Sequence, residues 1–164
     1  MKKSKKILLE IGPGFTPVAL KHKAKQRVMV DRIRFPKNYE EQKASQETGR
    51  TAEMVLGDIK QLPFRNEAFS RVEARMMNEL YGRKYGEVIR NIREVKRVMK
   101  KGGVITISAE NPYCDNIEKL FTNEGFVLIR QQKLEGKFYD TAWERAASFW
   151  KEIGSGKRFW FKKL

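Results

Sequence analysis

The sequence predicts an α/β fold built on a mostly parallel sheet, and two stretches carry this prediction. The first joins an apolar run at 7–9, a glycine-rich turn at 10–16 and a second apolar run that ends at Asp31. Short continuous apolar runs are typical of buried parallel strands. The second stretch, 86–108, has apolar residues at helical spacing, then a Gly-Gly pair and a run rich in isoleucine.

The remaining segments alternate between the two kinds of element. Strands are predicted at 7–9, 28–31, 52–56, 68–74, 103–108, 126–130 and 158–161, and helices at 18–24, 36–49, 86–100, 115–122 and 141–154. Pro17 suits the first position of a helix, and Thr141 with Glu144 forms a capping box. This alternation predicts a Rossmann-like, doubly wound sheet.

Length and composition favour a single domain spanning 1–164. The chain has 164 residues, of which 40% are hydrophobic, enough to bury a core. One cysteine, Cys114, excludes an internal disulfide, and one histidine, His22, argues against a zinc site, so no metal is expected. No apolar run reaches the length of a membrane span, and a cytoplasmic location is expected.

The strand-turn-helix-strand unit at 5–31 is typical of sites that bind a ribose-bearing ligand. Pro17 stands where a dinucleotide fingerprint needs its last glycine, and Glu10 would repel a pyrophosphate, which disfavours a nicotinamide oxidoreductase. Asp31 lies 19 residues after Gly12, close to the spacing of a ribose-binding acid. S-adenosylmethionine has a ribose, a positive charge and no phosphate, so it fits these observations.

At this point the sequence resembles the class I S-adenosylmethionine-dependent methyltransferases, in their small UbiE-like and type 11-like branch. The family pattern of an acid followed by alternating glycines matches at Glu10, Gly12 and Gly14, while Thr16 replaces the third glycine. The resemblance continues in order through 57–64 and 92–107. It implies that the last strand inserts antiparallel between strands five and six.

The resemblance also implies a cofactor site. It would comprise Glu10, Gly12, Gly14, Asp31, Asp58, Ile59 and Met76. Asp31 is expected to accept hydrogen bonds from the ribose hydroxyls, and Asp58 from the adenine amino group with Ile59 beside the ring. An ordinary tight turn and solvated strand ends are the alternatives for the glycines and the two aspartates.

The methyl acceptor is expected to lie after strand four, near Asn78, Glu79 and Tyr81. A helix cap with packing methionines is the alternative for this segment. No catalytic residue is predicted, because methyl transfer depends mainly on alignment and exclusion of water. Cys114 is interpreted as a small packing residue.

Two features point to the acceptor and partners. The net charge of +15 favours an anionic partner such as RNA or the ribosome, a basic surface without one partner being the alternative. The first strand starts near residue 6, so the fold is expected to be minimal, without the N-terminal lid helices of the family. The site would then be open to a large substrate, or closed by a partner chain or a second copy. A small-molecule methyltransferase and a non-catalytic binding module on the same fold remain alternatives.

Overall fold

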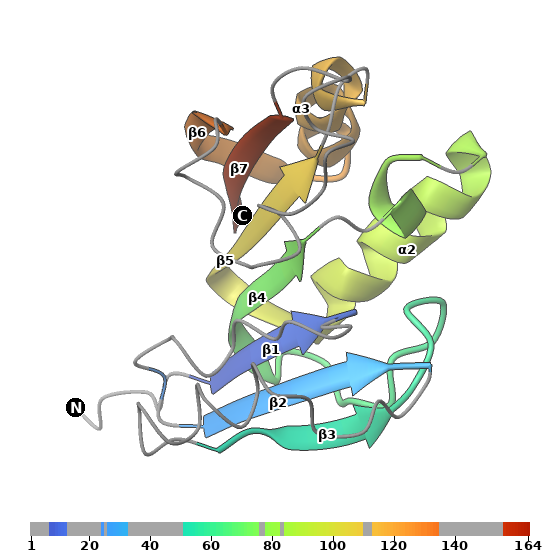
Figure 1. The fold of residues 1–164 in the computed structure, drawn as a ribbon, viewed down its shortest axis with the longest axis vertical. Coiled ribbons are helices and arrows are strands. Elements are labelled where there is room, and N and C mark those ends of the chain that lie inside the picture. Colours follow the sequence, from blue (N-terminus) through green and yellow to red (C-terminus); the bar gives the residue numbers. More distant parts are fainter. Residues whose placement is uncertain are drawn as a thin grey trace.

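The computed structural model describes residues 7–12, 24, 26–32, 51–75, 78–82, 84–109, 113–134 and 156–164. They form one seven-stranded sheet (Figure 1). Its strands are β1 (Ile7–Ile11), β2 (Gln26–Asp31), β3 (Glu53–Leu56), β4 (Phe69–Arg75), β5 (Met99–Ala109), β6 (Phe126–Leu134) and β7 (Gly156–Lys163). The helices are η2 (Asn78–Leu80), α2 (Tyr85–Val98) and α3 (Cys114–Asn123). The helices predicted at 18–24, 36–49 and 141–154 fall outside the described residues, apart from residue 24.

The strand order is β3-β2-β1-β4-β5-β7-β6. The first five strands in this order pair in parallel, and β7 runs antiparallel between β5 and β6. This confirms the predicted Rossmann-like, mostly parallel sheet with an antiparallel last strand. From β1 the chain builds outward to β2 and β3 on one side, then to β4 and β5 on the other. Such a reversal opens a ligand crevice at the carboxyl ends of the central strands.

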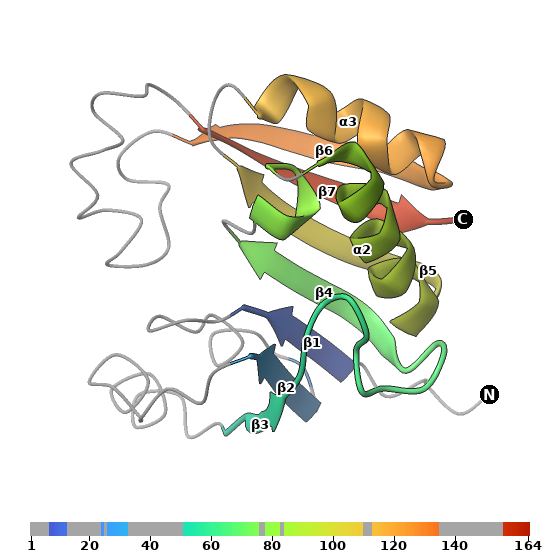
Figure 2. The ribbon, with the colours of Figure 1, turned by 90° about the vertical axis from the view of Figure 1, so that its right-hand side faces the viewer.

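The apolar stripe of α2 packs on one face of this sheet. Val88, Ile92 and Val95 are buried, and they join one core cluster with Ile105 and Ile107 of β5. Lys96 and Arg97 lie in the last turn, where cations complement the helix dipole. Figure 2 shows α2 and α3 in front of the same face of the sheet.

The helix predicted at 86–100 ends two residues earlier, at Val98. Met99 already begins β5 and pairs with Phe69, and the register then shifts, so that Arg71 pairs with Val104. The Gly-Gly pair that follows the predicted helix is therefore part of an irregularity inside the strand. A Cβ on Gly103 would lie only 2.9 Å from the Lys100 carbonyl oxygen, which explains why a glycine is needed there.

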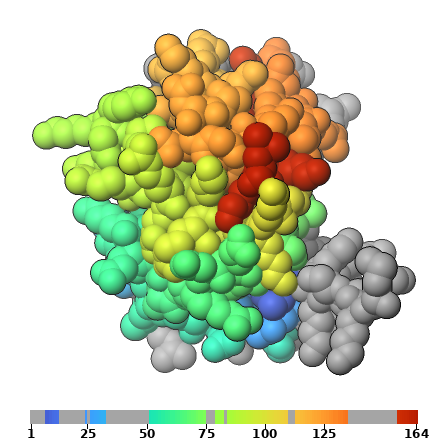
Figure 3. Space-filling view, turned by 180° about the vertical axis from the view of Figure 1, so that it is seen from behind, coloured from blue at the N-terminus to red at the C-terminus, as the bar shows by residue number. Residues whose placement is uncertain are grey.

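The second half of the sheet is held by aromatic packing under α3. Phe121 of α3 stacks on Phe161 of β7 at 4.8 Å between ring centroids and meets Phe126 of β6 at 5.3 Å. Both strands are longer than predicted, since β6 continues to Leu134 and β7 spans Gly156–Lys163. Most of the residues that extend them, such as Gln131, Gln132 and Lys133, are polar, and apolar patterning does not mark such residues. In Figure 3, seen from behind, part of β7 (red) reaches the surface beside orange residues of α3 and β6.

The opposite face of the sheet changes character from one end to the other. At the β1–β3 end it is apolar, with Leu8 and Met29 in a small separate cluster. Towards β4, β5 and β7 it is polar. The register aligns Glu10 with Glu73 and Glu73 with Thr106, so their side chains project to one face. These three residues are no more than 3% exposed.

Candidate functional site

The end of β1 supplies a buried acid and a left-handed glycine. Glu10 is 3% exposed, on the face turned away from α2. Gly12 follows with φ of 63°, a conformation that residues with a side chain rarely adopt. Its amide donates to the Val30 carbonyl at 2.9 Å. The first turn after β1 is thereby tied to the neighbouring strand β2.

The end of β2 is tied in the same way to the loop after β3. The Asp31 carbonyl accepts a hydrogen bond of 2.9 Å from the Gly57 amide. A Cβ on Gly57 would lie 2.8 Å from Cδ of Pro63 and 2.9 Å from Cγ2 of Val30. Glycine at this position therefore allows the loop that carries Asp58 to approach the end of β2 closely.

Asp58 begins a tight turn that its own side chain stabilises. Its Oδ1 accepts from the Lys60 amide at 2.9 Å, and its carbonyl accepts from the Gln61 amide at 3.0 Å. Ile59, the next residue, is 6% exposed and belongs to the main core. The turn thus presents the carboxylate of Asp58 while it anchors the backbone through Ile59.

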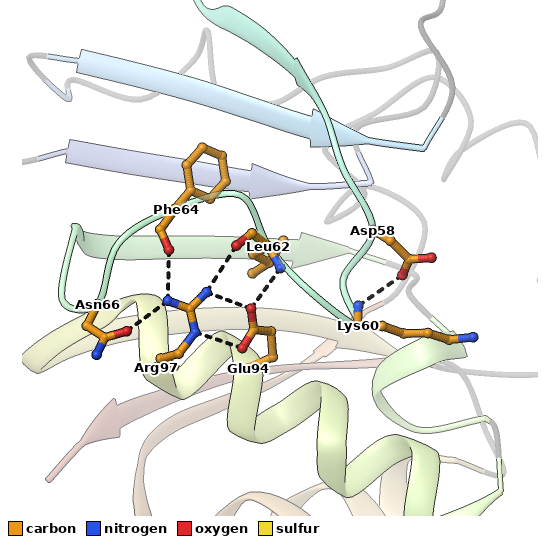
Figure 4. A network of polar contacts seen from close by, with 7 residues as sticks. All are labelled: Asp58, Lys60, Leu62, Phe64, Asn66, Glu94 and Arg97. Carbon is orange, nitrogen blue, oxygen red and sulfur yellow. Dashed lines mark hydrogen bonds and ion pairs between the residues drawn. The ribbon is translucent and has the colours of Figure 1, made fainter.

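Two side chains of α2 hold the rest of this loop (Figure 4). Arg97 donates to the carbonyls of Leu62 and Phe64 at 3.0 and 2.8 Å, and to Asn66 Oδ1 at 2.8 Å. Glu94 Oε1 accepts from the Leu62 amide at 2.7 Å and from Arg97 at 2.6 Å. The hydrogen bond from Arg97 lowers the pKa of Glu94, although burial opposes this, and the same bond raises the pKa of Arg97. The pair acts as a charged clamp on 62–66.

Beyond β4, the segment predicted to meet the acceptor lies over the same edge. The Glu79 carbonyl accepts from Asn91 Nδ2 of α2 at 2.9 Å, and Asn91 is only 2% exposed. Glu79 Oε1 lies 3.5 Å from the Arg32 guanidinium, just after β2. Because β1 lies between β2 and β4, this ion pair spans the end of β1. Tyr81 is 7% exposed and lies 5.6 Å, between ring centroids, from Tyr113.

Comparison with known proteins agrees with this architecture. A family model described as "Methyltransferase domain" matches residues 9–107. The chain belongs to this family. Membership confirms the resemblance found in the sequence, and with it an enzyme class that uses S-adenosylmethionine as cofactor. No curated protein matches the chain.

Solved structures share the fold of this methyltransferase at low identity. An S-adenosylmethionine-dependent methyltransferase from Methanosarcina mazei is 16% identical with a TM-score of 0.67, covering 99% of this chain and 94% of its own. N-methyltransferase NodS from Bradyrhizobium japonicum, solved with S-adenosylhomocysteine, is 15% identical with a TM-score of 0.67. The match covers 96% of this chain and 78% of NodS. A Haloferax volcanii complex of the Trm112 methyltransferase activator with a methyltransferase matches with a TM-score of 0.63 and 11% identity. The match covers 99% of this chain and 84% of the matched chain. At these identities the likeness establishes the fold.

The structure describes some of the predicted site residues of the methyltransferase and leaves others outside the described part of the chain. Glu10, Gly12, Asp31 and Asp58 lie at or just beyond the carboxyl ends of the adjacent strands β1, β2 and β3. Gly14 and Met76 fall outside the described residues, and of Asn78 only the backbone is described. Three carboxylates and a turning glycine backbone at one edge suit a ligand that carries hydroxyl groups and a positive charge, and S-adenosylmethionine is such a ligand.

Three polar residues of α2 that hold the neighbouring loops, Asn91, Glu94 and Arg97, belong to no motif found in the sequence. Asn91 bonds the segment after β4, while Glu94 and Arg97 bond residues 62–66 of the loop that leads from Asp58 back to β4. The only available signal was a polar residue near an apolar stripe, as with Asn91 beside Ile92. Cys114 is buried, and its thiol donates to the Ala109 carbonyl at 3.2 Å, in keeping with its interpretation as a packing residue.

Two further features concern metals and membranes. Within the described part of the chain, no group of three or more histidine, cysteine, aspartate or glutamate side chains could hold a metal ion. In the same residues, no helix is long and apolar enough to span a membrane.

Proposed function

We propose that Glu10, Gly12, Asp31 and Asp58 bind S-adenosylmethionine and that the chain transfers its methyl group to an anionic macromolecule in the cytoplasm. One observation carries the cofactor part of the proposal. Amide-to-carbonyl hydrogen bonds link the ends of β1 and β2, and of β2 and the loop after β3, where these residues lie. Their spacing is therefore set by the sheet.

Each residue has a role that its surroundings support. Asp31 accepts from the ribose hydroxyls, and Asp58, held by its own turn, accepts from the adenine amino group. Gly12, which has no Cβ, lets the methionine part approach the backbone closely, and the buried Glu10 favours the positive end of the ligand. The cofactor supplies a sulfonium methyl that is already electrophilic, so the protein needs to align the acceptor and exclude water.

Asn78, Glu79 and Tyr81 face the acceptor in this proposal. The contact between Glu79 and Arg32 supports this assignment, because it brings the segment after β4 over the strand that carries Gly12. A strong catalytic base is unnecessary when the acceptor atom is unprotonated at neutral pH. The net charge of +15 favours RNA or the ribosome over a small neutral acceptor.

Calorimetry and methyl transfer test the two parts separately. Titration of the whole chain with S-adenosylmethionine should give saturable heat, and no binding at millimolar concentration would refute the cofactor assignment. Incubation with S-adenosylmethionine labelled in the methyl group, together with total RNA, ribosomes or a small-molecule extract, identifies the acceptor. Label only in the small-molecule fraction would refute the macromolecular acceptor.

A non-catalytic binding module is the second candidate, and one observation favours it. Glu73 is fully buried beside Glu10, and its Oε1 lies 3.0 Å from the Arg71 guanidinium. The strand β4, next to the proposed site, is therefore unusually polar for a central strand of a methyltransferase sheet. A chain that binds the cofactor but labels none of the three fractions would favour this module.

A further inference from the structure

The face of β6 and β7 turned away from α3 has an unusual surface. Phe159 and Phe161 point into the core, so Trp160 between them faces the other side and is partly exposed. Arg130 pairs with Trp160 in the register, and Val127 pairs with Lys162. Arg130 and Lys162 are exposed, and Val127 is 41% exposed. An aromatic ring and two cations therefore share one side of a two-stranded surface.

The arrangement around Trp160 resembles a stacking platform. The Arg130 guanidinium lies 4.6 Å from the ring centroid, and that of Arg158 lies 6.0 Å away. Arg130 also donates to Gln132 Oε1 at 3.3 Å, which orients its planar group along the strand. Aromatic rings and guanidinium planes are the groups on which unpaired bases stack. Some proteins bind single-stranded nucleic acids on a sheet face that carries such groups.

The charge of this surface is positive. Among the described residues, neither Arg130 nor Lys162 has a carboxylate partner. Arg71 of β4 lies in the same register row as Val104 and Lys162, and its side chain remains 42% exposed. Glu73 lies in the neighbouring row, with Thr106 and Trp160, and is buried and paired with Arg71. A phosphate backbone would meet cations along the row.

We propose that this face, defined by Arg71, Arg130, Trp160 and Lys162 and here called the β7 face, binds a single-stranded nucleic acid. Charge complementarity supports this occupant, since the chain carries +15. Trp160 shares a register row with Glu10 and lies three strand spacings from it, about 14 Å. The role of the bound strand as methyl acceptor rests on the proposed function.

Fluorescence anisotropy with labelled 12-nucleotide RNA and DNA single strands, measured from low to physiological salt, tests the inference. The variant R130A/K162A should bind at least about tenfold more weakly at low salt. Its plot of log affinity against log salt should lose about 1.4 units of slope, because two phosphate contacts disappear. W160L should weaken binding roughly 5- to 150-fold with little change of slope, which is the contribution of one stacked base.

The matched control is R90A/K119A, which removes the same charge from exposed positions of α2 and α3. It should bind within about twofold of the parent chain. Equal loss in both double variants would overturn the inference, as would binding to anionic vesicles but not to oligonucleotides. Comparing the affinities for the RNA and the DNA oligonucleotides identifies which of the two nucleic acids is preferred.

Cofactor titration separates this inference from the proposed function. A parent chain that binds S-adenosylmethionine but no oligonucleotide overturns the inference alone. A chain that binds oligonucleotides through the β7 face but no cofactor supports the inference and overturns the proposed function. R130A/K162A should keep the parent affinity for the cofactor, since neither residue lies at the carboxyl ends of β1, β2 and β3, where the proposed cofactor site is.

Discussion

Glu94 and Arg97 lie one helical turn apart on α2 and bind each other while both hold a loop more than 25 residues away in sequence. Glu94 Oε1 and Oε2 accept from the Arg97 guanidinium at 2.6 and 2.8 Å. Arg97 side-chain nitrogens then bond two carbonyls of the loop, and Glu94 bonds an amide of the same loop. This two-sided contact fixes the segment that follows Asp58.

Replacing Arg97 by alanine should destabilise the protein and weaken cofactor binding together. The loop carbonyls and the Glu94 carboxylate would lose their donor, at a cost of about 1–3 kcal/mol in the free energy of unfolding. Arg97→Lys should recover only part of the lost stability and affinity, because lysine lacks the planar guanidinium group that donates several hydrogen bonds at once. Urea unfolding and calorimetry with S-adenosylmethionine measure the two effects. A variant with lower stability but unchanged affinity would show that Arg97 does not position the loop for the cofactor.

The stability should depend on pH through Glu94. The pKa of Glu94 is lowered in the folded state by the hydrogen bond from Arg97. The unfolded chain therefore takes up its proton first as the pH falls, so this contribution is present at neutral pH. It is lost as the pH falls below the ordinary glutamate range towards the lowered pKa of the folded state.

Urea unfolding of Glu94→Gln at several pH values between 7 and 3 measures this dependence. The variant should be less stable than the parent at pH 7, and the difference should shrink as the pH falls. Glu87→Gln, at an acid of the first turn of the same helix, serves as control. A constant difference across the series would contradict the assignment.

Gly57→Ala should damage the site, whereas Gly86→Ala should not. A Cβ at residue 57 would lie within 3.0 Å of Pro63 and Val30, so the loop or the end of β2 must move. We expect a loss of roughly 1–3 kcal/mol, typical of an overpacked position, and weaker cofactor binding. At residue 86 nothing lies within 4 Å, and alanine in α2 should be neutral or stabilise by up to about 1 kcal/mol. Thermal unfolding of both variants checks the contrast.

Asp31→Asn should weaken S-adenosylmethionine binding by about 1–3 kcal/mol, since the amide offers the ribose hydroxyls one poorer acceptor in place of a carboxylate. Asp115→Asn is the control, because Asp115 is an exposed carboxylate at the start of α3 that pairs with Lys157 and follows β5, not β1, β2 or β3. Calorimetry at constant salt gives both affinities. Equal affinities in parent and D31N would remove Asp31 from the proposed site.

The order and type of the described elements followed from local patterning. The apolar run of β1 and the stripe of Val88, Ile92 and Val95 predicted a buried strand and a helix, and both formed at those places. The end of the helix was misplaced, because Met99 continues the stripe although its backbone is already extended. Pairing of Met99 with Phe69 outweighs the local pattern there, and sequence spacing does not report such a contact.

The sequence by itself determined the fold class, the family and the glycine turn with its nearby acids, because these depend on short-range spacing and on the burial of apolar residues. The tertiary structure alone decided that Arg97 and Glu94 hold the loop after Asp58, and that Trp160 and Arg130 share an outward face. Both arrangements depend on the register and on contacts between distant segments. The side chains involved are charged or aromatic residues that local patterning assigns equally well to a solvated surface or a core.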